Sequence, residues 1–374
     1  MNVVVTGIGL ISAFGSRDLT WNRLLAGETA IKQHQPYQSL TAYPLALIGH
    51  TPTCIDYLTR QLVGAALVDA GLTAPIPDCG VVIGSSRGNQ ARWEGLAADF
   101  ISRNATPIGW LETLPHRAAT TVAQILATAG PVSSPMAACA TGIWAIAQGA
   151  DLIRFGVCQR VLAGGVETPI TPLTLAGFQQ MGALAQSGAY PFDRAREGMV
   201  LGEGGAILVL ESETLARQRS ARIYGQILRA GFTADGYHVS APEPGSPSAK
   251  LAIRQCLSRS HLTAEEIGYI HAHGTATRLN DANEAALIHH LFPPQVWVSS
   301  TKGATGHTIG ASGAIGVALC LMALRTQILP PGVGLQSPAF DLAFVTQAEP
   351  IALNTALCFS FGFGGQNAVL AVSH

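Results

Sequence analysis

A cysteine among small residues is the first candidate for chemistry in this 374-residue chain. Cys139 lies in the segment MAACATG, directly before an apolar stretch that predicts a helix. The N-terminus of a helix offers unpaired N–H groups and the positive end of the helix dipole, and both favour the thiolate form of a nearby cysteine. We therefore expect Cys139 to be a nucleophile with a lowered pKa. The alternative is a small buried core residue, which is a common role of free cysteine.

A histidine pair ends a predicted strand in the segment HAHGTAT, where His271 and His273 point to the same face. Such a pair can bind a metal ion, but no second cysteine or carboxylate follows at ligand spacing, so we expect no metal site. His273 stands beside Gly274 at the carboxyl end of the strand, where open parallel sheets bind their ligands. This position favours an acid–base or hydrogen-bonding role for His273.

Two further glycine-rich segments could stabilise negative charge. Lys302 and His307 bracket glycines in STKGATGH, although Lys302 precedes the glycines, whereas in a phosphate-binding loop it would follow them. The segment predicts a positive pocket for an anion or a developing oxyanion, with a core role for His307 as the alternative. In SFGFGGQN, the glycines after Phe361 permit positive φ angles, and the N–H groups of such a loop can complete an oxyanion hole. Phe361 could equally be an ordinary core residue.

The elements that must position these residues alternate along the chain. Short apolar runs predict strands at 3–6, 79–83, 160–165, 206–211, 269–272, 296–299 and 368–372. Longer periodic segments predict helices at 56–70, 121–129, 143–155, 248–258, 282–290 and 312–326. The alternation predicts an α/β fold with mostly parallel strands. The opening GIG is no dinucleotide fingerprint, because its third glycine is absent.

Two predicted helices, 142–155 and 310–324, are apolar on nearly all sides and must be covered on both faces. Each follows a small-residue loop that carries a candidate residue, which suggests an internal duplication with a second half from about residue 221. The first half is longer, and its surplus at about 85–120 could form a cap over one face.

The composition limits the function classes. Charged residues make up only 12%, so the chain must bury whole layers of structure or hide surface in an oligomer. A net charge of −1 gives no basic footprint for nucleic acid. The apolar run 311–324 is too short to span a membrane, and the N-terminus lacks the basic residues of a signal peptide. Seven cysteines without a CxxC pair predict reduced thiols and a cytoplasmic protein.

Taken together and in this order, the segments resemble the β-ketoacyl-acyl carrier protein synthases, in particular the elongating type of dissociated fatty acid and polyketide synthesis. The matching segments are VVVTGIGLISAFG, ACATG with the following GGVET, PFDRAREGMVLGEGGAILVLE, HGTAT, STKGATGHTIGASG and SFGFGGQNA. The resemblance implies a thiolase-like α/β fold, with duplicated βαβαβαββ halves in a five-layer αβαβα sandwich. Residues 1–220 would hold the cap and the nucleophile, and residues 221–374 the two catalytic histidines.

The resemblance also implies roles for single residues. Cys139 would take the acyl group from the carrier protein as a thioester. His273 and His307 would stabilise the enolate that forms when a malonyl thioester loses CO2. Lys302 would hold His307 in place and set the local electrostatic field. The backbone N–H groups of Cys139 and Phe361 would form the oxyanion hole, and Phe361 would gate the acyl pocket.

Other residues would have supporting roles. Asp281 and Glu284 would be the carboxylate neighbours of Lys302, and Met199, Thr275 and Thr277 would contact substrate. The substrates would be carried on the phosphopantetheine of acyl carrier protein, with no cofactor and no metal. The partner would dock on a basic patch, for which the candidates are Arg60, Arg217, Arg219 and Arg222.

The implied reaction is a decarboxylative Claisen condensation that gives β-ketoacyl-acyl carrier protein, in a homodimer or in a heterodimer with a related ketosynthase subunit. The alternative is a non-catalytic partner subunit that sets chain length, but such partners typically lack the nucleophile. A thiolase-like or hydrolytic enzyme is a third possibility. Arg278 replaces a proline often found after HGT-x-T, Phe359 stands where Asn is common, and Gln366 replaces Thr. These departures favour a specialised polyketide, polyene or lipid pathway.

Overall fold

The computed structural model describes residues 1–103, 106 and 108–374. Its central feature is one long path of hydrogen-bonded strands that crosses both halves of the chain. In the first half the order is β1 (Val3–Ser12), β9 (Gly204–Ser212), β7 (Arg160–Glu167), β5 (Gly80–Gly84) and β6 (Val132–Ser133). In the second it is β10 (Gly225–Ala234), β17 (Gln366–Ser373), β16 (Thr355–Gly362), β11 (Tyr269–His271), β12 (Trp297–Ser299) and β14 (Ala343–Phe344). The two parts join where β1 pairs with β10.

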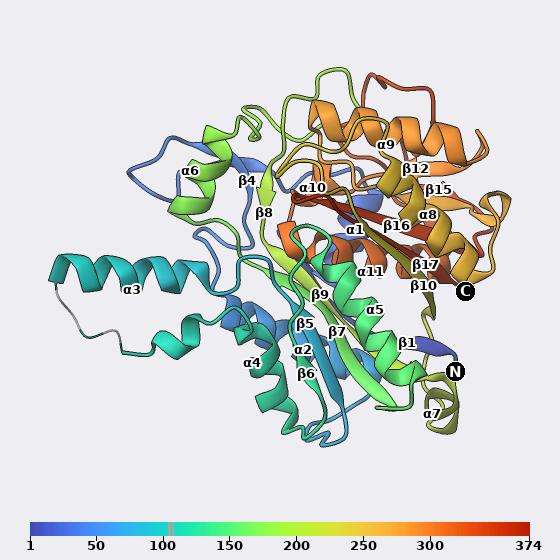
Figure 1. Cartoon of the computed structure of the whole chain (residues 1–374), viewed down its shortest axis with the longest axis horizontal. Coiled ribbons are helices and arrows are strands. Elements are labelled where there is room, and N and C mark those ends of the chain that lie inside the picture. Colours follow the sequence, from blue (N-terminus) through green and yellow to red (C-terminus); the bar gives the residue numbers. More distant parts are fainter. Residues whose placement is uncertain (104–105, 107) are drawn as a thin grey trace.

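Helices lie on both faces of each part of this sheet (Figure 1). The helices α5 (Thr141–Arg154) and α11 (Ser312–Thr326) contact strands of both halves and form the middle layer. On the outside of the first half lie α2 (Ile55–Ala70) and α4 (Arg117–Leu126). On the outside of the second lie α8 (Pro247–Ser260) and α9 (Arg278–Leu291). The five-layer α/β architecture expected from the sequence is confirmed.

The middle layer explains why two helices lack a polar face. Every residue of α11 from Gly313 to Leu324 is buried, and α5 is buried along most of its length. The segment Ile309–Thr326 is long and apolar enough to cross a membrane, but 83% of it is buried inside the protein. We conclude that it is a core helix, as the sequence predicts.

The strand pairing differs from the mostly parallel sheet expected from the sequence. β5, β6 and β7 are parallel to one another, as are β11, β12, β14 and β16. In the centre, β1, β9, β10 and β17 pair antiparallel. One part of the reason is that β10 and β16, which both pair antiparallel with β17, were not recognised as strands in the sequence: β16 turns back into β17 through a hairpin at residues 363–365.

The remaining elements are short or peripheral. They are β2 (Gly15–Ser16), α1 (Arg17–Leu25), β3 (Lys32–His34), β4 (Tyr43–Ala46), α3 (Gln90–Arg103), η1 (Trp110–Thr113), α6 (Pro172–Gln180), β8 (Leu201–Gly202), α7 (Glu213–Gln218), η2 (Ala264–Glu266), α10 (Lys302–Thr305), η3 (Ile309–Ala311), β13 (Ile328–Leu329) and β15 (Glu349–Pro350).

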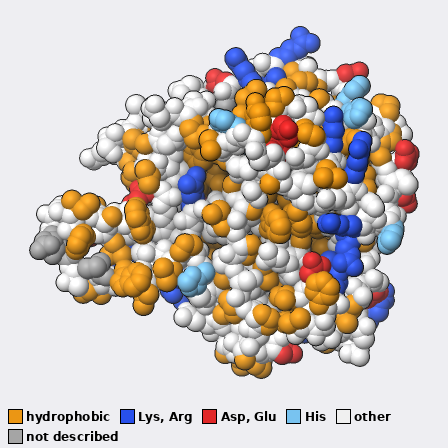
Figure 2. All heavy atoms as spheres, viewed as in Figure 1, with side chains coloured by type: hydrophobic (Ala, Val, Ile, Leu, Met, Phe, Trp, Pro, Cys, Tyr) orange, Lys and Arg blue, Asp and Glu red, His pale blue; other side chains and the backbone are white. Residues whose placement is uncertain are grey.

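The segment expected to cap one face instead projects from the body of the molecule as an arm made of α3 and η1 (Figure 1). No side chain of α3 is buried. Hydrophobic side chains cover the arm (Figure 2), among them the exposed Trp93, Phe100, Ile101, Trp110 and Leu111. Residues 104, 105 and 107 of this segment lie outside the described residues. The chain passes to the second half between α7 and β10, and we propose residues 1–220 and 221–374 as the two halves.

The contact between α5 and α11 requires a glycine. A Cβ atom on Gly142 would lie 2.4 Å from the backbone nitrogen of Ala314, which is far inside van der Waals contact. We predict that Gly142→Ala lowers the free energy of unfolding by about 1–3 kcal/mol, because the two helices must separate. Urea unfolding followed by circular dichroism measures this change.

The matched control is Gly64→Ala in the exposed interior of α2, where an added Cβ meets nothing within 4 Å. Alanine there should leave the stability unchanged or raise it by roughly 0.5–1 kcal/mol. Equal effects of the two substitutions would contradict the proposed packing.

Candidate active site

Cys139 stands in a tight turn directly before α5. The residue before it, Ala138, has a φ of 47°, a backbone conformation that residues other than glycine rarely adopt. The Thr141 hydroxyl closes the turn by donating to the Ala138 carbonyl at 2.7 Å and accepting from the Ala137 amide at 2.9 Å. The Ser360 hydroxyl donates to the Cys139 carbonyl oxygen at 2.8 Å. These bonds fix the backbone on both sides of the sulfur.

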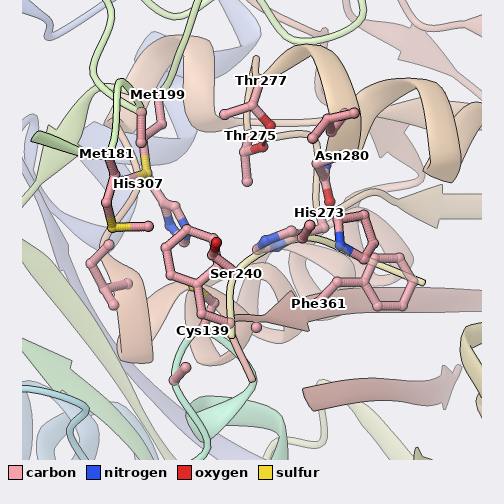
Figure 3. A pocket seen from close by; sticks show the side chains of 18 of the residues that line it. Cys139, Met181, Met199, Ser240, His273, Thr275, Thr277, Asn280, His307 and Phe361 are labelled. Atoms are coloured by element: carbon pink, nitrogen blue, oxygen red, sulfur yellow. Dashed lines mark hydrogen bonds between the residues drawn. The ribbon is translucent and has the colours of Figure 1, made fainter. Parts of the chain in front are cut away.

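The structure brings both predicted histidines to this cysteine (Figure 3). His273 follows β11, and His307 lies between α10 and η3, where its amide donates to the Val200 carbonyl oxygen at 2.7 Å. The two imidazole rings are 5.2 Å apart between centroids and nearly perpendicular, at 81°. One donor atom from each histidine and the Cys139 sulfur all lie within 4.8 Å of one another. The sequence alone does not show that these three residues lie close together.

Burial sets the protonation of the three groups. It lowers the pKa of His273 and of His307 well below the usual range, and the positive charge of Lys302 acts in the same direction. Burial raises the pKa of the Cys139 thiol to about 11, although Lys302 opposes this rise. The lowered thiol pKa expected from the helix N-terminus is therefore wrong for the free site, because desolvation outweighs the favourable charges. The site holds a neutral thiol between two neutral imidazoles.

Lys302 contacts His273, whereas the sequence analysis assigned it to His307. Its Nζ donates to the His273 carbonyl oxygen and lies 3.4 Å from His273 Nδ1. The reason is that α10 follows β12 after two residues and β12 pairs in parallel with β11, so the start of α10 lies near the residues that follow β11. An ammonium at Nδ1 favours the tautomer with the proton on Nε2, so His273 can donate a hydrogen bond from that nitrogen.

The two carboxylates expected beside Lys302 are bonded to backbone amides. Glu284 accepts from the amides of His273 at 2.6 Å and Gly274 at 2.7 Å. Asp281 accepts from the Phe192 amide at 2.8 Å. Burial raises the pKa of Glu284, and it raises that of Asp281 to about 6. Both residues act on Lys302 through space, and Glu284 also fixes the backbone that carries His273.

A cavity of about 540 Å³ opens onto Cys139. Met199, Thr275, Thr277 and Phe361 line it, as the sequence analysis expected of substrate contacts. The hydroxyl groups of Thr275 and Thr277 are 2.9 Å apart. Phe361 also packs against the His273 ring, with centroids 6.1 Å apart.

The backbone amide of Phe363 acts on the Cys139 sulfur and lowers the pKa of the thiol, which makes Phe363 a second candidate for the oxyanion hole beside the predicted Phe361. Phe361 belongs to β16 and is paired with Asn367 of β17, whereas Phe363 stands in the turn between these strands. The turn can approach the cysteine because Gly362 has no side chain: a Cβ there would lie 3.0 Å from the Cys139 amide nitrogen. The three-glycine pattern pointed to this turn but not to the residue within it.

Sequence reasoning missed Arg87 and Glu167. Arg87 lines the cavity from the loop after β5. The buried carboxylate of Glu167, at the end of β7, accepts bonds from the Ser86 amide at 2.8 Å, the Arg87 amide at 3.1 Å and the Gly310 amide at 3.0 Å. Both residues follow or end apolar strands, which is the signal that could have identified them.

The set of Cys139, His273 and His307 consists of atom types that can also hold a thiophilic metal ion. The Lys302 ammonium next to His273 disfavours a cation at this point. Two N–H donors, a cation and a cysteine are better suited to developing negative charge.

Family models match both halves of the chain. Residues 53–216 match the β-ketoacyl synthase N-terminal domain, and residues 224–336 match the β-ketoacyl synthase C-terminal domain. The chain belongs to the β-ketoacyl synthase family. The resemblance seen in the sequence, the thiolase-like fold and the assignment as an acyltransferase of the ketosynthase type are confirmed.

Relatives cover nearly the whole chain. The 3-oxoacyl-(acyl-carrier-protein) synthase 2 of Synechocystis is 36% identical, over 99% of this chain and 97% of the relative. That of Vibrio harveyi is 30% identical, over 98% and 97%. Among solved structures, the ishigamide ketosynthase/chain length factor superposes with a TM-score of 0.92 at 26% identity, over 100% of this chain and 98% of the other. A type II polyketide ketosynthase in complex with its acyl-carrier protein reaches 0.93 at 25%, over 100% and 99%.

The raised pKa of Cys139 predicts a steep pH dependence of its alkylation. With a pKa of about 11, roughly one thiol in a thousand is ionised at pH 8. The rate of carboxamidomethylation by iodoacetamide should therefore rise about tenfold per pH unit between pH 7 and 10. Peptide mass spectrometry follows Cys139, and the exposed Cys54 is removed as Cys54→Ser so that it does not consume reagent.

Lys302→Met should slow this alkylation at every pH, because it removes the positive charge that lowers the thiol pKa. A rate that is already constant below pH 9 would mean that the thiolate forms in the free site.

Proposed function

We propose that this protein catalyses the decarboxylative condensation of an acyl group held on Cys139 with malonyl-acyl carrier protein. The single observation that carries the proposal is the group of Cys139, His273 and His307 at one cavity, with their donor atoms within 4.8 Å of one another. The relatives named 3-oxoacyl-(acyl-carrier-protein) synthase 2 support the same carrier-bound substrates. The product is a β-ketoacyl-acyl carrier protein.

In the first step the Cys139 sulfur attacks the carbonyl carbon of the acyl thioester. Because the resting thiol is neutral, an imidazole takes the proton and passes it to the departing carrier thiol. The N–H groups of Cys139 and Phe363 hold the oxyanion of the tetrahedral intermediate. The products are the acyl-enzyme and the free carrier thiol.

In the second step His273 and His307 donate N–H bonds to the carbonyl oxygen of the malonyl thioester. The C–CO2 bond breaks, and its electron pair becomes the enolate that these bonds stabilise. The enolate carbon attacks the acyl carbonyl on Cys139, forms the new C–C bond and expels the Cys139 thiolate, which takes a proton from solvent to restore the resting thiol. The hydroxyls of Thr275 and Thr277 face the cavity where the carrier's pantetheine would lie, and we assign them to its amide groups.

The reaction requires no cofactor and no metal ion from the protein. The presence of the cysteine and both histidines favours the enzyme over the alternative, a non-catalytic partner that sets chain length, because such a partner would not need these three residues. We propose a cytoplasmic location on the basis of the seven free cysteines.

For the carrier protein, only part of the basic patch expected from the sequence remains a candidate. Arg217, Arg219 and Arg222 form ion pairs with carboxylates of the same chain, so we no longer assign them to carrier binding. Arg60 stays a prediction. We further propose a dimer, because β6 is an exposed sheet edge with Val132 42% exposed and the α3 arm carries exposed hydrophobic residues. The ketosynthase/chain length factor complexes among similar structures support a heterodimer as the other form.

We predict that an acyl-carrier protein leaves a single acyl group on Cys139 and that malonyl-carrier protein then removes it with release of CO2. Intact-mass spectrometry with peptide mapping measures the adduct, and labelled malonyl measures the CO2. His273→Ala and His307→Ala should still accept the acyl group, because one imidazole remains to take the thiol proton. Each variant should lower decarboxylation at least about a hundredfold, because each removes a donor to the enolate.

Cys139→Ser is the matched control, since it keeps the size of the side chain and removes the thiol. If the wild-type protein is folded and takes no acyl group at any chain length, the proposed condensation is wrong and a missing catalytic partner becomes the leading explanation.

Light scattering after size-exclusion chromatography tests the dimer. We expect a mass of about twice 38.9 kDa for the purified chain. Val132→Lys, which places a charge on the exposed edge, should shift the protein towards the monomer. A wild-type monomer that still condenses substrates would contradict a functional dimer.

A further inference from the structure

Arg87 places a positive charge in the wall of the catalytic cavity. The loop that carries it follows β5, and its backbone is fixed by the bond from the Arg87 amide to the buried Glu167 carboxylate at 3.1 Å. The guanidinium lies over the Phe178 ring, 5.4 Å from the centroid. Its charge is close enough to Cys139 to lower the pKa of the thiol. The residue is exposed, so a ligand in the cavity can reach the guanidinium.

The guanidinium has no carboxylate partner among the residues that the structure describes. Within the described part of the chain, eleven ion pairs are formed and none includes Arg87. Its side chain also donates no hydrogen bond to another described residue, whereas Arg154, Arg160 and Arg219 all do. The Arg87 fork of N–H donors is therefore free for a ligand that enters the cavity.

The surroundings of Arg87 indicate which part of a substrate it would meet. Phe178 packs in one hydrophobic cluster with Cys139, Met199 and Ile309, and its ring lies 6.1 Å from that of Phe363. This apolar wall begins at the nucleophile and suits the hydrocarbon part of an acyl chain. Thr275 and Thr277, which we assigned to pantetheine, directly precede α9 and line the cavity from the second half of the chain. Arg87 thus borders the acyl wall.

We propose that Arg87 selects acyl donors that carry a carboxylate on the far part of the chain, the thioesters of dicarboxylic acids. This inference rests on the proposed function. A guanidinium matches the planar geometry of a carboxylate with two parallel hydrogen bonds, and Phe178 beneath it holds the fork in place. The malonyl carboxylate is a poor candidate for this contact, because an ion pair would stabilise the group that has to leave as CO2.

The test compares the rate of Cys139 acylation by thioesters matched in chain length. The pairs are butyryl and succinyl, hexanoyl and adipoyl, and octanoyl and suberoyl, each on the same carrier protein and followed by intact-mass spectrometry. In the wild-type protein, at least one carboxy-acyl donor should react about tenfold faster than its methyl-terminated partner, the size of one hydrogen-bonded charge contact. The length of the preferred pair then measures the distance from Cys139 to the guanidinium.

Arg87→Met keeps an unbranched apolar stem and removes the guanidinium, and it should abolish or reverse this preference. Arg87→Lys should keep a part of it, since the charge remains and the fork is lost. The control is Arg92→Met, which removes the same charge from the exposed start of α3, outside the cavity. It should keep the full preference.

The outcomes separate the two proposals. Equal acylation by both members of every pair, or a loss in Arg87→Met that is confined to malonyl turnover, would overturn the role of Arg87 and leave the condensation intact. The same holds if Arg92→Met changes the ratio as much as Arg87→Met. If no donor of either kind acylates the wild-type protein, the proposed function itself fails.

Discussion

The packing of α5 against α11 between the two parts of the sheet is the constraint on which the rest of the molecule depends. The helix α11 is covered on all sides and α5 along most of its length, so neither can shift without opening a layer. The loop before α5 carries Cys139, and the segment before α11 carries His307. Close approach of the helices at Gly142 and Ala314 therefore also sets how near the nucleophile lies to the imidazole. Stability and catalytic geometry have the same origin here.

Burial in this layer has a direct chemical result. It removes water from the thiol and from both imidazoles, which makes their charged forms unfavourable. Because the thiol and both imidazoles are neutral at rest, no ion pair between them has to break when negative charge appears on a substrate oxygen. Fixed N–H donors then interact strongly with that charge, since no water competes for it. Lys302 adds one positive charge. Its ammonium donates to the His273 carbonyl oxygen, and the negative charge of Glu284 favours its protonated form.

The sequence predicted the parts of the fold that follow from local patterns. All seven predicted strands and all six predicted helices are present, because apolar runs and helical periodicity report on burial. It did not predict β10 or β16, the second of which runs into a glycine-rich turn that looks like a loop, and it did not predict the antiparallel centre of the sheet. Pairing depends on partners far apart in the chain, and no local pattern contains them.

The same limit applies to the site. The candidate residues Cys139, His273, Lys302 and His307 were found from their neighbours, and the structure brings all four together. Which histidine contacts Lys302, and whether Phe361 or Phe363 offers its amide to the sulfur, depends on distances of a few ångströms between separate loops. The thiol pKa was wrong for a related reason: the helix dipole can be inferred from sequence, but the depth of burial cannot.

The position of β1 has a consequence for how the chain reaches its native state during synthesis. The strand β1 lies between β9 and β10, so most of its hydrogen bonds to other strands cannot form until residues 204–234 have been made. The face of α5 that meets α11 stays open for longer still, until residue 326. The first half therefore cannot close as a finished unit while the second is being translated, and its apolar surfaces must be protected in the meantime.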